Sequence, residues 1–135
     1  MRFAAAAAGL VLALQAFACG YCVEDKIAST YDHAVVVRAL EHSHHVAFFH
    51  IDGVLPSGDG ARRTLAALAE SAAGVEKGSV RVSLDTFTLS FAFDPQRSSL
   101  DAAQRGVERK LALRKLSLMP LRVMERTADL KMPKK

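Results

Sequence analysis

Two adjacent segments near the middle of the chain alternate apolar and polar residues. Between residues 79 and 85, valines and a leucine alternate with polar residues, and between 87 and 93, phenylalanines and a leucine alternate with smaller residues. Every second side chain of an extended strand points to the same face, so a period of two predicts a strand. The two segments therefore predict a β-hairpin that turns at Asp85-Thr86.

Two other segments predict strands from their composition. Residues 45–51 are rich in aromatic and branched side chains, and the turn-forming pair Asp52-Gly53 follows them, so we expect a central strand there. Residues 116–124 predict the last strand. Pro120 places this strand at a sheet edge, because proline cannot donate a hydrogen bond to a neighbouring strand.

Apolar residues recur every three or four positions in three further segments, which is the spacing of one helical face. The predicted helices cover residues 24–41, 61–72 and 100–111. Asp59 is the expected N-cap of the second helix and Ser98 that of the third, since each offers a side-chain oxygen just before the apolar stripe. The first and last strands are apolar on both faces, so we expect the first helix, or alternatively a partner protein, to cover the second face.

After the first helix, the predicted order is strand, helix, strand, strand, helix, strand. This is the split order of ferredoxin-like folds, so we expect an α+β fold with a ferredoxin-like βαββαβ antiparallel sheet and an extra N-terminal helix. Residues 65–74, 75–82 and 91–95, with a Gly-Val junction, an alternating strand and a Phe-Asp-Pro exit, resemble the heavy-metal-associated (HMA) domain family. The similarity spans about residues 46–124.

The resemblance implies a metal-binding fold without the usual metal-binding loop. In the family, a Cys-x-x-Cys between the first strand and the first helix binds a soft cation such as Cu(I). The corresponding loop in this chain, residues 53–60, contains no cysteine, histidine or methionine. The ligands of the family therefore have no counterpart in this loop, and candidate ligands lie elsewhere in the chain.

The N-terminus predicts an export signal. Arg2 precedes an apolar stretch, and Ala16-Phe17-Ala18 fits the small-residue cleavage pattern, so we expect cleavage after Ala18. The stretch is shorter than the roughly 20 apolar residues that cross a bilayer, so no stable membrane span is expected. The sequence also disfavours a lipid anchor on Cys19, because Ala16 stands where a lipobox carries leucine. We therefore expect a secreted or periplasmic protein.

Cleavage would leave Cys19 and Cys22, in the motif Cys-Gly-Tyr-Cys, at the mature N-terminus. Thiolates suit Cu(I) or Zn(II), and the new α-amino group of Cys19 would be a third donor. A structural disulfide is the alternative in an oxidising compartment. A thiol-disulfide exchange site is a third interpretation, although the buried strand that precedes such a pair is missing. The expected organisation is a signal peptide (1–18), an N-terminal CxxC helix extension (19–44), an HMA-like domain (45–126) and a basic tail (127–135).

A cluster of histidines is the second candidate metal site. His42, His44 and His45 lie together just before the predicted central strand. Imidazole is a common ligand of zinc and copper, so all three are candidate ligands, and a surface turn that collects histidine without function is the alternative. His50 is expected to be a packed side chain, and Met119 is expected to fill the core rather than to bind a metal.

Charge and motifs narrow the class of function. From Arg97 onward, eleven Lys and Arg stand against four Asp and Glu, which fits a solvated helix face with a basic tail, or an anionic partner. Export argues against a role with nucleic acid, and the sequence carries no catalytic serine–histidine–aspartate set or phosphate-binding loop, so we expect no enzyme. The sequence thus predicts an exported binder or carrier of a soft metal, copper foremost. The alternative is a non-enzymatic interaction domain for a periplasmic protein partner, with a structural CxxC disulfide.

Overall fold

The computed structural model describes residues 15–130, with side chains from Val23 onward. Within this range, the α+β fold contains four α-helices, four β-strands and two short 3-10 helices. In chain order these are α1 (Gln15–Thr30), α2 (His33–Glu41), β1 (His45–Asp52), α3 (Ala61–Glu70), β2 (Arg81–Ser83), β3 (Thr88–Phe93), α4 (Leu100–Leu111), η1 (Ala112–Arg114), β4 (Ser117–Met124) and η2 (Thr127–Leu130).

The two ends of the predicted organisation fall partly outside the described residues. Of the predicted signal peptide, residues 1–14 lie outside them and residues 15–18 belong to α1. Of the predicted basic tail, residues 131–135 lie outside them. Residues 127–130 form η2, whose Asp129 carboxylate accepts hydrogen bonds from the backbone N–H groups of Glu125 and Arg126. The described part of the tail is therefore tied back to the end of β4.

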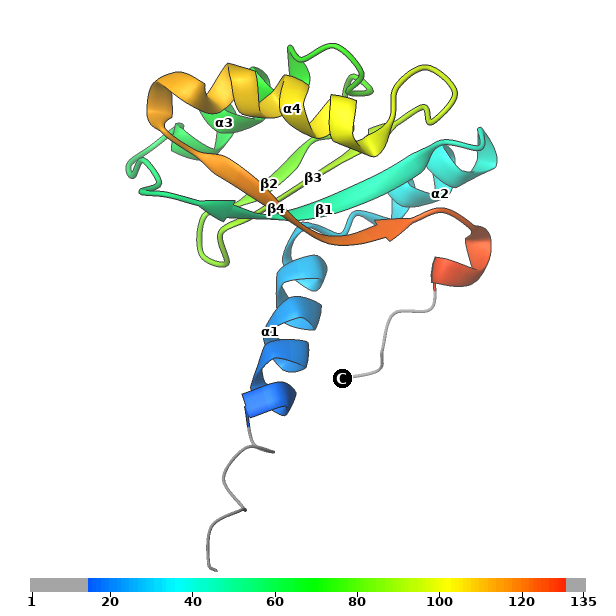
Figure 1. The fold of residues 1–135 in the computed structure, drawn as a ribbon, viewed down its shortest axis with the longest axis horizontal. Coiled ribbons are helices and arrows are strands. Elements are labelled where there is room, and N and C mark those ends of the chain that lie inside the picture. Colours follow the sequence, from blue (N-terminus) through cyan, green and yellow to red (C-terminus); the bar gives the residue numbers. More distant parts are fainter. Residues whose placement is uncertain (1–14, 131–135) are drawn as a thin grey trace, which may run out of the picture.

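The four strands form one antiparallel sheet in the order β2-β3-β1-β4 (Figure 1). β1 pairs with β3 on one side and with β4 on the other, so the predicted central strand is confirmed. β2 and β3 form the predicted hairpin. β4 lies at a sheet edge, as Pro120 indicated, and its register against β1 shifts between Phe48 and Phe49, where Phe49 faces Pro120.

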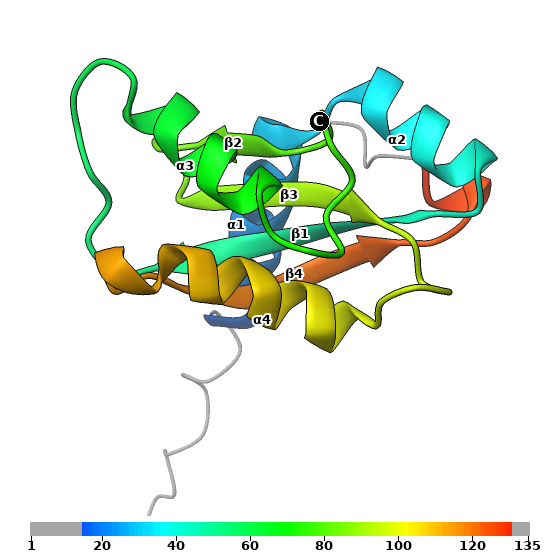
Figure 2. The same cartoon turned by 90° about the horizontal axis from the view of Figure 1, so that it is seen from above.

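Helices cover both faces of the sheet (Figure 1 and Figure 2). α3 and α4 cover one face, where Phe49 and Phe91 stack with ring centroids 5.3 Å apart inside the larger core cluster. On the other face, Ile27 of α1 and Val36 of α2 pack with Phe48 in a second cluster. The N-terminal helical segment therefore covers the second face as expected, and apolar burial on both faces of the sheet drives folding.

The N-terminal helical segment consists of two helices, and the single helix predicted over residues 24–41 is wrong. The chain breaks at Asp32, whose backbone is extended (φ −120°, ψ 110°). The Asp32 carboxylate accepts hydrogen bonds from the backbone N–H groups of Ala34 and Val35, which satisfies two of the donors that a helix start leaves free. Apolar spacing continues across this break, so periodicity alone does not reveal it.

The N-caps of α3 and α4 each lie one residue beyond the predicted position. Gly60, in the left-handed conformation (φ 84°), precedes α3 in place of Asp59. The Ser99 hydroxyl caps α4 by accepting a hydrogen bond from the Ala102 N–H at 3.1 Å, whereas the Ser98 hydroxyl donates to the Ser99 carbonyl. Ser98 and Ser99 offered equivalent capping oxygens, and the path of the chain into α4 selected Ser99, whereas α3 begins after a glycine and has no side-chain cap.

The hairpin turn is longer than the predicted two residues. β2 ends at Ser83, and residues 84–87 form the turn that contains Asp85-Thr86. Phe87 closes this turn with a positive φ of 55°, which is uncommon for a residue with a side chain. The Phe87 carbonyl accepts a hydrogen bond from the Ile51 N–H at 2.7 Å, so the turn is tied to the end of β1.

Candidate functional site

The CxxC motif lies within α1. Cys19 and Cys22 are three residues apart in this helix, and positions with this spacing are neighbours on one helical face. The side chains of both cysteines lie outside the part of the chain whose side chains the structure describes. What the structure does describe is how the following residues attach α1 to the sheet.

One attachment of α1 is an ion pair with the edge strand. Glu24 forms a two-pronged pair with Arg122 of β4, in which Arg122 Nη1 lies 3.1 Å from Glu24 Oε2 and Nη2 contacts Oε1. The hydrogen bonds that Arg122 donates to the Glu24 carboxylate raise the pKa of Arg122 above its ordinary value. Both side chains are about one third exposed, so water screens the pair and its contribution to stability is modest. Its two-pronged geometry nevertheless fixes the direction in which α1 leaves the sheet.

A second attachment of α1 involves Lys26. Its ammonium group donates a 2.6 Å hydrogen bond to the Thr86 carbonyl and lies 3.1 Å from His50 Nδ1. Burial, and then the positive charge of Lys26, hold the pKa of His50 below its ordinary value. Nδ1 of a neutral His50 can accept a hydrogen bond from the Lys26 ammonium group, whereas a charged His50 carries hydrogen on both ring nitrogens and cannot accept one. His50 is thus half-buried beneath α1, and its expected packed position is confirmed.

Packing completes the attachment of α1 between these polar contacts. Ile27 is fully buried among the side chains of the second core cluster. Further along the helix, the hydroxyl groups of Ser29 and Thr86 are 2.6 Å apart. Among the described side chains, the contacts therefore lie in the second half of α1, from Val23 onward. The first half, which carries the CxxC motif, runs away from the sheet (Figure 1).

The three candidate histidines have three different partners. His42 Nδ1 donates a 2.7 Å hydrogen bond to the Arg38 carbonyl and closes the end of α2. The ring of His45 meets the ring of Phe93 edge-on, with centroids 5.6 Å apart. His44 contacts neither of these partners and instead faces Glu76 and Asp94, although its ring centroid lies 6.1 Å from that of His42. The histidine turn also lies at one end of the sheet, apart from the outward half of α1 (Figure 1).

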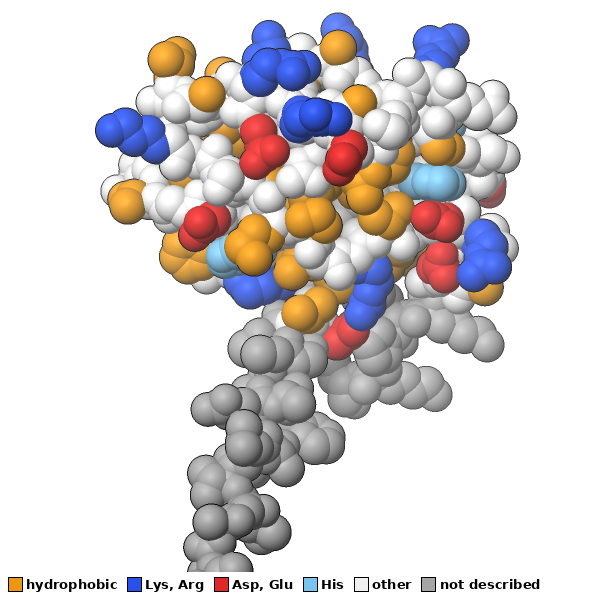
Figure 3. All heavy atoms as spheres, viewed as in Figure 1, with side chains coloured by type: hydrophobic (Ala, Val, Ile, Leu, Met, Phe, Trp, Pro, Cys, Tyr) orange, Lys and Arg blue, Asp and Glu red, His pale blue; other side chains and the backbone are white. Residues whose placement is uncertain are grey.

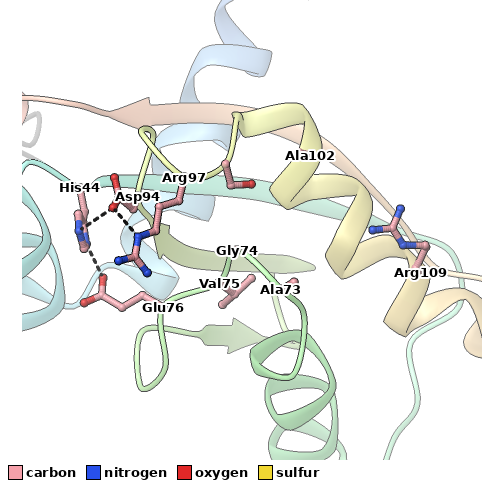
Figure 4. Close-up of a pocket in the computed structure, with 10 residues that line it drawn as sticks. His44, Ala73, Gly74, Val75, Glu76, Asp94, Arg97, Ala102 and Arg109 are labelled. Atoms are coloured by element: carbon pink, nitrogen blue, oxygen red, sulfur yellow. Dashed lines mark hydrogen bonds and ion pairs between the residues drawn. The ribbon is translucent and has the colours of Figure 1, made fainter.

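His44 is held between two carboxylates. Its Nδ1 lies 3.4 Å from Glu76 Oε2, and its Nε2 lies 3.7 Å from Asp94 Oδ2, with Arg97 Nε 3.7 Å from the same Asp94 oxygen (Figure 4). This cluster lines an open cavity of about 630 Å³, to which Arg109 of α4 also contributes. Because the carboxylates contact opposite nitrogens of the ring, they orient His44 rather than sharing an ion with it. Among the described side chains, no three His, Cys, Asp or Glu residues are placed to hold one metal ion.

The structure changes the role of one residue and adds two others. Met119, which was expected to fill the core, is 56 % exposed, because α1 leaves the sheet instead of lying along β4. Glu76 and Asp94 were not singled out as site residues. They lie 18 residues apart in sequence. The pairing of β1 with β3 brings Asp94 to His44, and the hydrogen bond from the Glu76 N–H to the Ala92 carbonyl brings Glu76 there. The role of Cys19 and Cys22 as metal ligands stays a prediction.

Comparison with known proteins does not assign a family to this chain. No protein-family model matches it. No curated protein matches it at a significant level. Among the described residues, no helix is long and apolar enough to cross a bilayer. The proposal below therefore depends on the residues of this chain and on their arrangement.

Proposed function

We propose that this chain is an exported, ferredoxin-like domain related to HMA proteins, which binds or carries a soft metal, Cu(I) foremost, through Cys19 and Cys22. The strand order β2-β3-β1-β4 supports the fold assignment, since two interleaved βαβ units would place β1 and β3 in the middle of an antiparallel sheet. Both helices that connect these units cover the same face, as this topology requires (Figure 2).

The chemistry of the motif supports a soft cation. Two thiolates are ligands that Cu(I) and Zn(II) prefer, and neighbouring positions on one helical face allow both to reach the same ion. Cleavage after Ala18 would add the α-amino group of Cys19 as a third donor. The sites in the described part of the chain are less suitable, because His42, His44 and His45 each contact a different partner.

The observation that carries the proposal is the placement of α1. Among the residues whose side chains are described, its contacts with the domain begin at Val23, and the preceding turns of the helix run away from the sheet (Figure 1). A rise of about 1.5 Å per residue puts position 19 about 7 Å beyond Glu24 along the helix axis. A metal held there would be accessible to a donor or acceptor protein. This arrangement suits transfer better than storage.

A metal titration tests the proposal directly. The protein would be purified under reducing conditions and titrated with Cu(I) against a chromogenic chelator that competes for the ion. We expect one equivalent to bind to the wild type and to be lost in the Cys19→Ser, Cys22→Ser double variant. The matched control replaces His42, His44 and His45 with alanine and should retain the equivalent. Equal weak binding by wild type and the cysteine variant would end the metal proposal.

The alternative function is a non-enzymatic interaction domain whose cysteines form a structural disulfide. The even number of cysteines and the predicted oxidising compartment favour it. Counting free thiols in protein purified without reductant separates the two proposals. Two reactive thiols, or their protection by added Cu(I), support the metal carrier. A complete lack of reactive thiols, with lower stability and no metal uptake after reduction, supports the interaction domain.

A further inference from the structure

The exposed large hydrophobic side chains of the described residues gather at one end of the sheet. These are Val54 (90 % exposed), Leu113 (98 %), Met119 (56 %) and Phe87 (40 %), and we call them the apolar end. Single exposed hydrophobic residues are common on protein surfaces, but they are normally scattered. Here they come from four separate segments of the chain. Their common position therefore needs a physical explanation.

Backbone contacts show that these four segments meet. Asp52, the last residue of β1, pairs with Ser117, the first residue of β4. A Cβ atom added at Gly53 would lie 2.9 Å from the Lys115 carbonyl oxygen, so the loop after β1 touches the chain that follows η1. The hairpin turn joins them through the hydrogen bond between Ile51 and Phe87. Val54, Leu113 and Phe87 each lie within two residues of these contacts.

The space between the loop and the hairpin turn is also apolar. An open hollow lies between residues 53–58 and 84–87, and Leu55, Pro56 and Leu84 line it. Met119 stands beside this region, because it pairs with His50, near the end of β1. The opposite end of the sheet carries the histidine turn and the cluster of His44, Glu76 and Asp94 instead (Figure 4).

Basic residues surround the apolar end. The exposed lysines and arginines around it are Arg114 and Lys115 on these segments, together with Arg62 and Arg63 at the start of α3 and Lys110 at the end of α4. The exposed acidic residues on the same segments are Asp52, Asp59 and Asp85. Hydrophobic and basic side chains stand out together at the left end of the molecule in Figure 3, where β1 ends. The surface is therefore apolar at its tips and net positive around them.

This combination identifies the kind of partner. Val54, on the loop after β1, and Leu113, on η1, are almost completely exposed, so they offer little flat area for a folded protein to pack against. Separate apolar tips can instead enter the boundary between headgroups and acyl chains, while nearby lysines and arginines attract anionic lipids. We propose that the apolar end docks onto the surface of an anionic lipid bilayer. This inference is independent of the metal proposed at Cys19 and Cys22.

The chain contains no tryptophan, which allows a site-specific test. Leu113→Trp places one fluorophore at the apolar end, and Val54→Trp is a second reporter on the neighbouring loop. Gln96→Trp is the matched control, because Gln96 is exposed in the turn after β3 at the opposite end of the sheet. Each full-length variant would be mixed with vesicles of phosphatidylcholine and phosphatidylglycerol that carry brominated acyl chains.

Docking predicts quenching and a blue shift for Leu113→Trp and Val54→Trp, and neither change for Gln96→Trp. The control matters because the apolar N-terminus is the same in all three variants and cannot produce a difference between them. Equal quenching of all three, or no quenching at residues 54 and 113, would overturn the proposal. A blue shift at residue 113 that needs no vesicles and grows with protein concentration would instead indicate self-association and would also overturn it.

The charge requirement has its own test in the Leu113→Trp protein. Each basic residue near an anionic surface contributes roughly a fivefold gain in affinity, so Arg114→Ala with Lys115→Ala should weaken vesicle binding about 25-fold. The matched pair Lys77→Ala with Arg97→Ala, at the opposite end, should leave it within about twofold. Equal effects of both pairs, or equally tight binding to pure phosphatidylcholine, would refute recognition of anionic lipid by this end.

Discussion

Ile27 provides the sharpest test of how the CxxC helix is attached. Its side chain is fully buried between α1 and the sheet, in a cluster with Val36 and Phe48. Ile27→Ala removes three carbon atoms, which corresponds to about 2.4 kcal/mol of lost transfer free energy at about 0.8 kcal/mol per buried methylene. The cavity that remains adds to this cost. We therefore expect the free energy of unfolding to fall by about 3 kcal/mol, within the usual range of about 2–5 for such substitutions.

Two measurements check this expectation. Urea denaturation followed by circular dichroism gives the change in the free energy of unfolding, and amide hydrogen exchange shows where protection is lost. The loss should be concentrated in α1, because Ile27 is its only large, fully buried side chain among the described residues. The matched control, Val107→Ala, opens the core on the opposite face, beneath α4. It should destabilise the domain without selective loss of protection in α1.

Two results would contradict the burial of Ile27 between α1 and the sheet. A decrease below about 0.5 kcal/mol, which is typical of surface substitutions, would mean that Ile27 is not buried as described. Unchanged exchange of the α1 amides in the Ile27→Ala protein would likewise refute this account of the attachment. The position of the CxxC motif relative to the sheet would then have to depend on the polar contacts of Glu24 and Lys26 alone.

Three further predictions concern single residues. Asp32→Ala should lower the melting temperature through loss of the α2 N-cap, worth about 1 kcal/mol, whereas Asp32→Asn should cost less because its amide oxygen still accepts. The hydrogen bond from the Val35 N–H is the main cause that holds the pKa of Asp32 below 3.8. The stabilisation by Asp32 is therefore complete above pH 3.8 and is lost on further acidification. Urea titrations of wild type and Asp32→Ala at several pH values measure this loss. Burial and the charge of Lys26 lower the pKa of His50. The contribution of His50 to the free energy of unfolding is therefore complete above the ordinary histidine pKa of 6.5 and declines as the pH falls below that value. In His50→Gln, the free energy of unfolding should depend less on pH between about pH 7 and 5. Gly53→Ala should cost about 1–3 kcal/mol in urea denaturation, since φ is +125° and the new Cβ would meet two atoms at 2.9 Å, while Gly58→Ala, which has open space around it, should cost less.

The predictions of β1, of β3 and of an edge position for β4 depended on local pattern and agree with the structure. The alternation of residues 87–93 predicted β3, and the aromatic stretch of residues 45–51 predicted β1, because the two faces of a strand are encoded by neighbouring residues. Pro120 correctly marked an edge strand, since the missing N–H of proline is a property of that residue alone. Local chemistry was sufficient to identify these three strands.

The predictions that failed depended on distant contacts or on the direction of the chain. The break at Asp32 was missed, because apolar residues keep helical spacing on both sides of it. Ser98 was chosen over Ser99 as the cap of α4, although the two offer the same hydroxyl group. Met119 was assigned to the core because its strand is apolar on both faces, but α1 leaves that part of the sheet uncovered.

The candidate site likewise has features that the sequence predicts and features that depend on the fold. A cysteine pair near the N-terminus, a histidine-rich turn and strands with two apolar faces can be recognised from the order of the residues. The separate partner of each histidine, the direction in which α1 carries the CxxC motif away from the sheet, and the common position of four exposed hydrophobic residues became visible in the folded chain. These outcomes depend on strand pairing and helix placement. Both result from burying apolar surface across the whole chain, so no short segment specifies them alone.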